Sequence, residues 1–204
     1  AVYKPMKAIL RLAAKHGMCA PPMIDSPTVK DPVVRAAGDE YLNALLPHVP
    51  ERILAVVLIA TDNAARTSEI LSLEWENVNL ARAEAEILDT KNGKPFLLAL
   101  TDRAVVALAN IEGERKDKVF KFSRNVVNRD LKKAREAAGL PYMKLHQIGR
   151  HTFAERLLKH GHTLNTVMQA GNWKDIRVVS KNYGHMERGL IHDIVRNPKG
   201  KVAQ

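Results

Sequence analysis

The chain has 204 residues, and 46% of them are hydrophobic, which allows a packed domain and argues against a globally disordered protein. Its one cysteine, Cys19, excludes an internal disulfide and a multi-cysteine zinc site and favours a reducing cytoplasm. The longest apolar run, residues 53–60, is too short to cross a bilayer, and no secretory signal pattern opens the chain, so no membrane association is expected.

The net charge of +10 is unevenly distributed. Residues 1–100 carry 11 Lys and Arg against 12 Asp and Glu, whereas residues 101–204 carry 21 against 10. A basic block of this kind suits a polyanion, and nucleic acid is the commonest one. A soluble basic surface without a partner explains the charge equally well.

The first part of the chain predicts one helix and a linker. Apolar residues recur on one face of a helix over residues 3–17, where Gly17 is a natural stop. Four prolines between residues 19 and 32 indicate an irregular connection. Since this connection follows directly on a single helix, we expect residues 1–24 to end a preceding N-terminal domain that is mostly absent, with a linker over 25–37.

The rest of the chain predicts a mainly α fold with a small antiparallel β-sheet (α+β), spanning residues 38–196, and a flexible tail over 197–204. Asn92-Gly93 marks a tight turn between the last two strands, and Thr101 with Asp102 can cap the helix that follows them. The expected strands are 78–80, 83–88 and 95–100. The expected helices after the linker are 39–46, 51–65, 68–73, 102–110, 123–138, 146–160, 163–170, 176–183 and 186–196.

Several polar residues sit where an anion would be bound, although each also has a structural explanation. Arg66 follows a buried apolar helix, and Glu69, one helical turn on, could orient it; an ordinary internal Arg–Glu pair looks the same. Lys91 and Lys94 flank a turn, where lysines are usually solvated but could also reach a phosphate.

The densest cluster, Lys144 to Ala154, places two histidines and an arginine at the start of a helix. A helix N-terminus favours anions, and the Arg150 fork suits phosphate oxygens. His151 fits a structural role, buried against its own helix. Tyr183 alone is indistinguishable from any core aromatic residue.

Together and in this order, these segments resemble the tyrosine recombinase (phage integrase) family, over roughly residues 35–190. Two spacings depart from the family pattern. His146 precedes Arg150 by four residues instead of three, and Trp173 precedes Tyr183 by ten instead of nine. Ala64 also stands where the family usually has glycine. The matching segments are Ala65 to Trp75, Thr90 to Lys94, His146 to Ala154, Gly171 to Trp173, and Tyr183 to His185.

The resemblance implies a catalytic domain that cleaves and rejoins DNA strands through a 3′-phosphotyrosyl intermediate, as a site-specific recombinase or integrase. Two arginines would hold the phosphate, a tyrosine would attack it, and a lysine would protonate the leaving 5′ oxygen. Because the phosphotyrosine keeps the bond energy, no cofactor and no metal are expected. The implied catalytic residues are Arg66, Lys91, His146, Arg150, Trp173 and Tyr183.

The resemblance also implies partners and a place of action. The expected partners are double-stranded DNA and further protomers on paired DNA sites, with a tetramer in the synaptic complex and a monomer free in solution. We expect a cytoplasmic, nucleoid-associated protein, encoded by a bacterium or phage and carried by a mobile element. Phosphate contacts are expected from Lys94, Lys132, Lys133 and Arg135, although the last three could merely solvate their helix.

Three other functions remain open from the residues. A type IB topoisomerase-like nicking and resealing enzyme would share the constellation without needing a partner protomer. A DNA-binding protein of the same fold that has lost catalysis would explain the two spacing departures. A basic helical domain that binds RNA or protein would require the ordered motifs to be coincidental.

Overall fold

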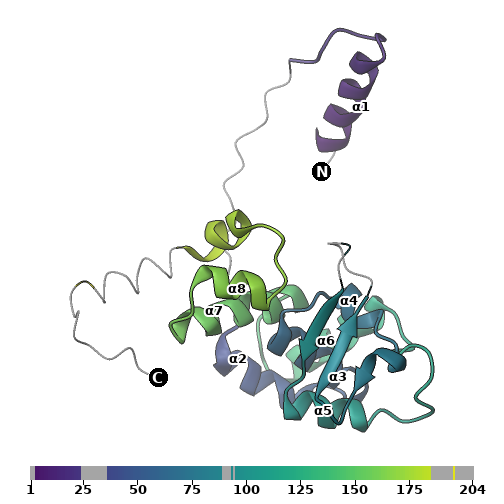
Figure 1. Ribbon diagram of the computed structural model, residues 1–204, viewed down its shortest axis with the longest axis vertical. Helices are drawn as coiled ribbons and strands as arrows, with labels where there is room; N and C mark the ends of the chain where they lie inside the picture. Colours follow the sequence, from purple (N-terminus) through teal and green to yellow (C-terminus); the bar gives the residue numbers. More distant parts are fainter. Residues whose placement is uncertain (1–2, 24–35, 89–92, 94, 185–194, 196–204) are drawn as a thin grey trace. The chain divides into compact units, whose positions relative to one another are not determined.

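The computed structural model describes residues 3–23, 36–88, 93, 95–184 and 195 (Figure 1). The chain divides into two compact units, residues 1–33 and 34–204. The first unit holds the predicted helix, α1 (Tyr3–Lys15), which ends at Gly17 in the left-handed conformation. None of the described helices is long and apolar enough to span a bilayer.

The second unit is mainly helical with one three-stranded antiparallel sheet, which confirms the predicted fold class. Figure 1 shows the sheet at one end of this unit and α7 and α8 at the other. The elements are α2 (Gly38–Leu45), η1 (Leu46–His48), α3 (Glu51–Asn63), α4 (Thr67–Leu71), η2 (Trp75–Asn77), β1 (Val78–Asn79), β2 (Glu84–Ile87), β3 (Phe96–Ala99), α5 (Asp102–Ala109), α6 (Arg124–Ala137), η3 (Gln147–His151), α7 (Thr152–Lys159) and α8 (Leu164–Ala170). A further helix covers 176–184.

The sheet has the order β1-β2-β3, and its register pairs Val78 with Ala85 and Ile87 with Phe96. Residues 85 and 87 of β2 are buried while 84 and 86 are not, the alternation expected of a sheet with one face on the core. The three predicted strands are confirmed, each slightly shorter than expected. The predicted turn residue Asn92 and the lysines beside it lie outside the described residues.

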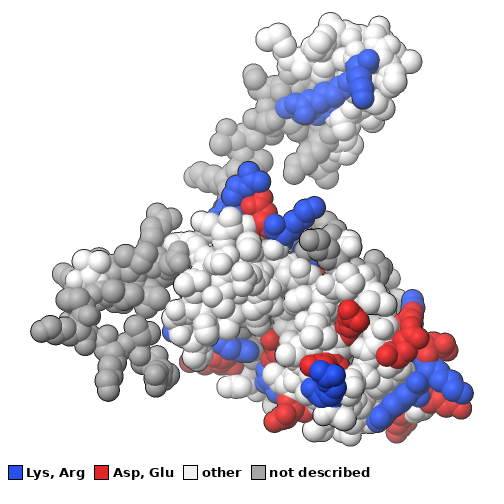
Figure 2. All heavy atoms as spheres, viewed as in Figure 1, with Lys and Arg blue, Asp and Glu red and all other residues white. Residues whose placement is uncertain are grey.

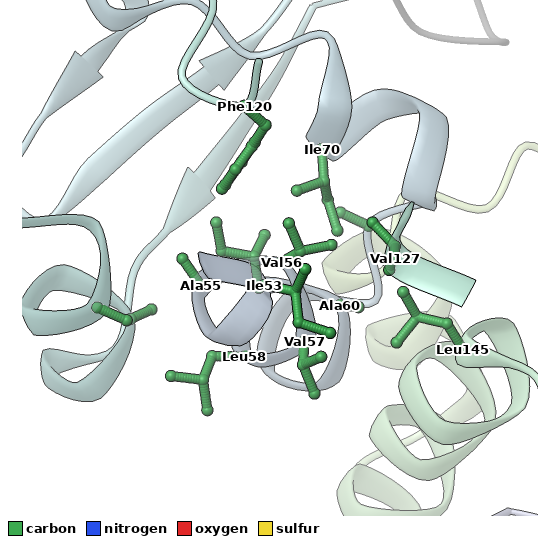
Figure 3. Packing of buried hydrophobic residues seen from close by; sticks show 14 of the residues in the cluster. Ile53, Ala55, Val56, Val57, Leu58, Ala60, Ile70, Phe120, Val127 and Leu145 are labelled. Atoms are coloured by element: carbon green, nitrogen blue, oxygen red, sulfur yellow. The ribbon is translucent and has the colours of Figure 1, made fainter. Parts of the chain in front are cut away.

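Helix α3 forms the centre of the core. Ile53, Val56, Val57 and Ile59 are fully buried, so the helix is covered on every side (Figure 3). Figure 3 shows Ile70 of α4, Val127 of α6, Phe120 of the loop before α6, and Leu145, just before η3, converging on it. Each fully buried aliphatic side chain contributes about 1.5–3 kcal/mol to this core. A helix surrounded by other elements needs apolar side chains around its whole circumference, and the thirteen residues of α3 are mostly apolar.

The end of α3 differs from the prediction because the chain leaves the helix earlier. Ala64 adopts φ 54° and ψ 17°, the left-handed region, instead of continuing the helix to residue 65. Arg66 then takes the extended conformation that precedes α4. The reversal brings the residues after α3 back against the core and, as described below, directs the Ala64 carbonyl oxygen toward a buried arginine.

The predicted capping by Thr101 is wrong. Thr101 occupies the N-cap position of α5, but its side chain makes no capping bond and donates instead to Asp62 Oδ2 at 2.7 Å. Asp62 is buried in α3 and also accepts from Arg103. Burial would raise the pKa of Asp62, but the hydrogen bonds from Arg103 and Thr101 outweigh it and lower the pKa. The carboxylate therefore ties α3 to α5.

The predicted continuous helix over residues 146–160 is interrupted by a π-helical turn. Residues Gln147–His151 form η3, and the regular helix α7 begins only at Thr152. A π turn holds one residue more than an α turn, and such turns are often found at functional sites. The additional residue between His146 and Arg150 is therefore accommodated within the helix.

Gly149 lets this π turn lie against α3. A Cβ atom at position 149 would be 2.6 Å from the Ala60 carbonyl oxygen and 3.0 Å from its carbonyl carbon, and neither backbone atom can rotate away. We expect Gly149→Ala to destabilise the fold by about 1–3 kcal/mol, measured by urea unfolding. Gly184→Ala is the control, because its nearest neighbour is the rotatable Ser180 hydroxyl at 3.2 Å. Equal stability of the two variants would contradict the close approach.

The end of the unit farthest from the sheet has its own small core. It is formed by α7, α8 and the helix over 176–184, and includes Leu158, Val167, Val179 and Tyr183. Trp173, in the loop after α8, packs against it. Tyr183 thus belongs to an apolar cluster distinct from the one around α3.

Candidate active site

Arg66 is held in place by Glu69. The Glu69 carboxylate accepts from the Arg66 backbone N–H at 2.8 Å and from its Nη1 at 2.5 Å. Only 4% of Glu69 is exposed, whereas the Arg66 side chain keeps 26% exposure. One buried carboxylate therefore both caps α4 and orients the guanidinium. The spacing predicted the contact with the guanidinium but not the cap. The exposed part of the guanidinium remains open toward a ligand.

Arg150 is buried without a complete set of partners. Its exposure is 2%, its Nη1 donates to the Ala64 carbonyl oxygen at 2.7 Å, and its Nη2 has no hydrogen-bond partner in the described structure. Desolvation and the nearby positive charge of Arg66 lower the pKa of Arg150 to about 10, so the group stays charged at neutral pH. A buried cation with an unused donor is costly unless an anion meets it.

Trp173 covers this arginine. The Arg150 guanidinium carbon lies 4.1 Å from the centre of the indole ring, a cation–π contact. The ring also lies across Gly171, where a Cβ atom would come within 1.7 Å of it. The glycine in the Gly171-Asn172-Trp173 segment is therefore needed for the position of the indole. The predicted role of Trp173 as an indole N–H donor to phosphate stays a prediction.

Tyr183 lies beside this pair, with 3% of its surface exposed. Its ring meets Trp173 edge-on at 6.3 Å between centres, and its hydroxyl makes a short hydrogen bond with Nδ1 of His151. Burial raises the pKa of Tyr183, which the positive charge of Arg150 partly opposes. The structure thus brings Arg150, Trp173 and Tyr183 together in one place.

The two histidines occupy different positions from those expected. His146 keeps solvent access, and its ring meets the His151 ring edge-on at 5.0 Å between centres. Desolvation by the surrounding atoms and the positive charges of Arg150 and Arg66 lower the pKa of His146. The histidine that contacts Tyr183 is His151, which sequence reasoning treated as structural. The π turn, which places residues five apart above one another, could not be read from the sequence.

The residues predicted to contact DNA differ in their exposure to solvent. Lys132 and Lys133 are exposed on α6, and Lys132 pairs with Glu136 at 3.6 Å. Arg135 is 5% exposed; its Nη1 donates to the Met143 carbonyl oxygen at 2.6 Å and its guanidinium lies over Tyr142. These contacts tie Arg135 to the loop before η3, and its contact with a DNA phosphate stays a prediction. Lys91 and Lys94 lie outside the described residues.

Basic side chains gather around a hollow beside the site. A cavity of about 570 Å³ extends from Thr67 and His146 along α6, with walls that include Arg124, Arg129, Lys132 and Lys144. On the face drawn in Figure 2, side chains of both signs lie mostly along the edges of the second unit, around a broad uncharged area. No cluster of three or more metal-ligating side chains occurs in the part of the chain that the structure describes.

Comparison with known proteins gives relatives of one kind. The chain is 25% identical to the integrase of Salmonella phage P22 over 202 residues, covering 89% of this chain and 52% of the relative. It is 29% identical to the tyrosine recombinase XerA of Saccharolobus solfataricus over 144 residues, covering 70% and 47%. The chain therefore spans about half the length of these curated relatives.

Solved structures share the fold at lower sequence identity. The catalytic domain of bacteriophage HP1 integrase matches with a TM-score of 0.63 at 18% identity, covering 84% of this chain and 99% of that one. A XerH site-specific recombinase bound to a palindromic difH substrate matches with a TM-score of 0.66 at 17% identity, covering 85% and 57%. The model of the phage integrase family matches residues 39–188, most of the chain, and the chain belongs to that family.

Proposed function

We propose that the protein is a site-specific DNA recombinase, which cleaves and rejoins DNA strands through a covalent 3′-phosphotyrosyl intermediate. The observation that carries this proposal is the buried, unpaired Nη2 donor of Arg150 beside Tyr183 and near Arg66. A phosphodiester is an anion that would satisfy this donor. Family membership and relatives named as integrases and recombinases support it.

The arginines would act on the charge of the reacting phosphate. A nucleophile approaches a phosphodiester against electrostatic repulsion, and further negative charge develops on the oxygens at the five-coordinate phosphorus. Arg150, fixed by Ala64 and Trp173, and Arg66, fixed by Glu69, need no reorganisation to meet that charge. The Tyr183 oxygen then bonds to phosphorus, and the bond from phosphorus to the 5′ oxygen breaks.

The remaining predicted residues complete the proposed site. Lys91 would give a proton to the leaving 5′ oxygen, and His146 would assist proton transfer from the solvent-facing side. Trp173 shields Arg150 from water, which strengthens the interaction of Arg150 with a phosphate. An indole N–H donated to a phosphate oxygen remains part of the proposal. No cofactor takes part in these steps.

The proposed substrate is double-stranded DNA with two recombination sites. Solved relatives include a XerH recombinase with its difH substrate and a transposon integrase with transposon end DNA. The basic hollow along α6 would receive a phosphate backbone. Lys94, Lys132, Lys133 and Arg135 would be further contacts. We propose that residues 38–196 are the catalytic domain and that residues 1–24 are the terminal helix of an N-terminal core-binding domain. Four protomers would assemble on paired sites, in the cytoplasm near the nucleoid.

A covalent-trap assay tests the function. The protein is incubated with a nicked suicide substrate, from which the strand downstream of the cleavage site is lost after attack, and the products are run on a denaturing gel. We expect a protein–DNA adduct whose DNA is attached through its 3′ phosphate. Binding without any adduct would support the alternative of a DNA-binding protein that has lost catalysis, which the burial of Tyr183 favours.

A further inference from the structure

We propose that His151 accepts the proton of the Tyr183 hydroxyl when the strand is cleaved and returns it when the strand is rejoined. The inference rests on the proposed function and adds a catalytic residue to it. His151 is also distinct from His146, the residue to which the sequence motif assigned proton transfer.

The geometry that carries the proposal is the contact between the two side chains. The Tyr183 hydroxyl and His151 Nδ1 are within hydrogen-bond distance, and their rings lie 5.7 Å apart between centres at 58°. His151 is fixed at the junction of η3 and α7, and Tyr183 is fixed in the apolar cluster that includes Val167 and Val179. The reacting oxygen is therefore held against one ring nitrogen from two separate elements.

The protonation states fit a hydrogen bond donated by Tyr183. Burial, together with His146 and Arg150, lowers the pKa of His151 to about 4, so the ring is neutral at pH 7. The pKa of Tyr183 is raised, so the phenol keeps its proton. A neutral imidazole with its hydrogen on Nε2 offers a free electron pair on Nδ1, and the phenol O–H donates to it.

His146 lies next to His151, on the side away from Tyr183. The π turn brings the rings of residues 146 and 151 edge-on at 5.0 Å, with His146 on the solvent side and His151 on the tyrosine side. His151, not His146, is therefore the histidine in direct contact with Tyr183. His146 is placed to exchange protons between His151 and water, without touching Tyr183 in this arrangement.

The arriving phosphate provides the trigger for proton transfer. In the free protein the low pKa of His151 and the raised pKa of Tyr183 keep the proton on oxygen. The charged groups around the pair are Arg150 and Glu155, with His146 beside them. A phosphodiester bound to Arg150 offsets its positive charge and favours the imidazolium form of His151.

The proton and bond changes then balance. The proton moves from the Tyr183 oxygen to His151 Nδ1 as that oxygen bonds to phosphorus, and the bond to the 5′ oxygen breaks with the electron pair leaving on oxygen. The general acid, Lys91 in the proposed function, protonates the 5′ oxygen. In rejoining, Lys91 takes back the proton of the 5′ hydroxyl as that oxygen bonds to phosphorus. The bond from phosphorus to the Tyr183 oxygen breaks, and His151 returns its proton to that oxygen.

The test uses His151→Asn, whose amide occupies the region of Nδ1 and accepts a hydrogen bond but takes up no proton at neutral pH. Single-turnover adduct formation on the nicked suicide substrate is expected to fall about 10²- to 10⁴-fold, with DNA binding unchanged. The rate of the variant should rise about tenfold per pH unit, because hydroxide must now deprotonate Tyr183, whereas the wild-type rate should be flat from pH 7 to 9. His160→Asn is the matched control, because this exposed histidine directly follows the last residue of α7.

A second variant separates proton transfer from packing. His151→Ala leaves space beside the tyrosine, and added imidazole is expected to restore a measurable part of its rate. The inference is overturned if His151→Asn cleaves within threefold of the wild-type rate. It is also overturned if His151→Asn is slow but keeps the flat pH profile while His151→Ala gains nothing from imidazole. Either result leaves the proposed function intact. Absence of any adduct with the wild-type protein overturns the proposed function itself.

Discussion

Tyr183→Phe is expected to abolish the covalent DNA adduct while leaving DNA binding within about threefold of wild type. Phenylalanine keeps the ring in the cluster formed by Val167, Val179 and Trp173 and removes only the hydroxyl. The adduct needs that oxygen as the nucleophile, so no partial activity is expected. The measurement is the denaturing-gel trap assay with the nicked suicide substrate.

Tyr41→Phe is the matched control, because this buried tyrosine also loses only a hydroxyl, one that donates to the Pro141 carbonyl oxygen at 2.9 Å. It should form the adduct at close to the wild-type rate. An adduct that persists in Tyr183→Phe would remove Tyr183 as the nucleophile and leave the family membership untouched. Tyr183→Phe should also unfold at a slightly lower temperature than the wild-type protein, since the hydrogen bond to His151 is lost.

The second large effect is expected from Arg150→Met. Methionine has a similar length and no charge, so the phosphate would lose one of its two fixed guanidinium groups. We expect cleavage to slow about 10²- to 10³-fold, the range found when one donor is removed from a preorganised anion site. Single-turnover kinetics at saturating DNA would measure it, with the exposed Arg177→Met as control.

The same substitution should not lower stability, and this separates a functional arginine from a structural one. Arg150 is 2% exposed, one of its donors is unsatisfied, and its charge lies near that of Arg66. Replacing such a buried charge with an apolar side chain is often neutral or stabilising. We therefore expect an equal or higher melting temperature. A large loss of stability with normal cleavage would show that Arg150 holds the fold together.

The order of the elements was largely predictable from local patterns. Proline and glycine positions, apolar periodicity and short β-prone stretches located α1 to α8 and the three strands, with errors of one or two residues at most ends. The pairing of Arg66 with Glu69 was also predictable, because residues three apart on a helix meet without help from the rest of the fold. These features depend on contacts close in sequence.

The errors arose where distant segments meet. Thr101 was expected to cap its own helix, but a buried carboxylate from α3 offered a stronger partner. The burial of Arg135 was likewise not predictable, because the carbonyl oxygen and the aromatic ring that hold it come from the following loop. Propensity and charge counts carry no information about such partners.

The sequence by itself determined the family, the fold class and the order of Arg66, Arg150, Trp173 and Tyr183 along the chain. The tertiary structure decided which of these groups meet and which histidine reaches the tyrosine. Close packing of η3 against α3 at Gly149 and the π turn that follows from one additional residue set the direction of every side chain from His146 to His151. The free energy of that packing comes from contacts between segments some ninety residues apart, which no local pattern in the chain records.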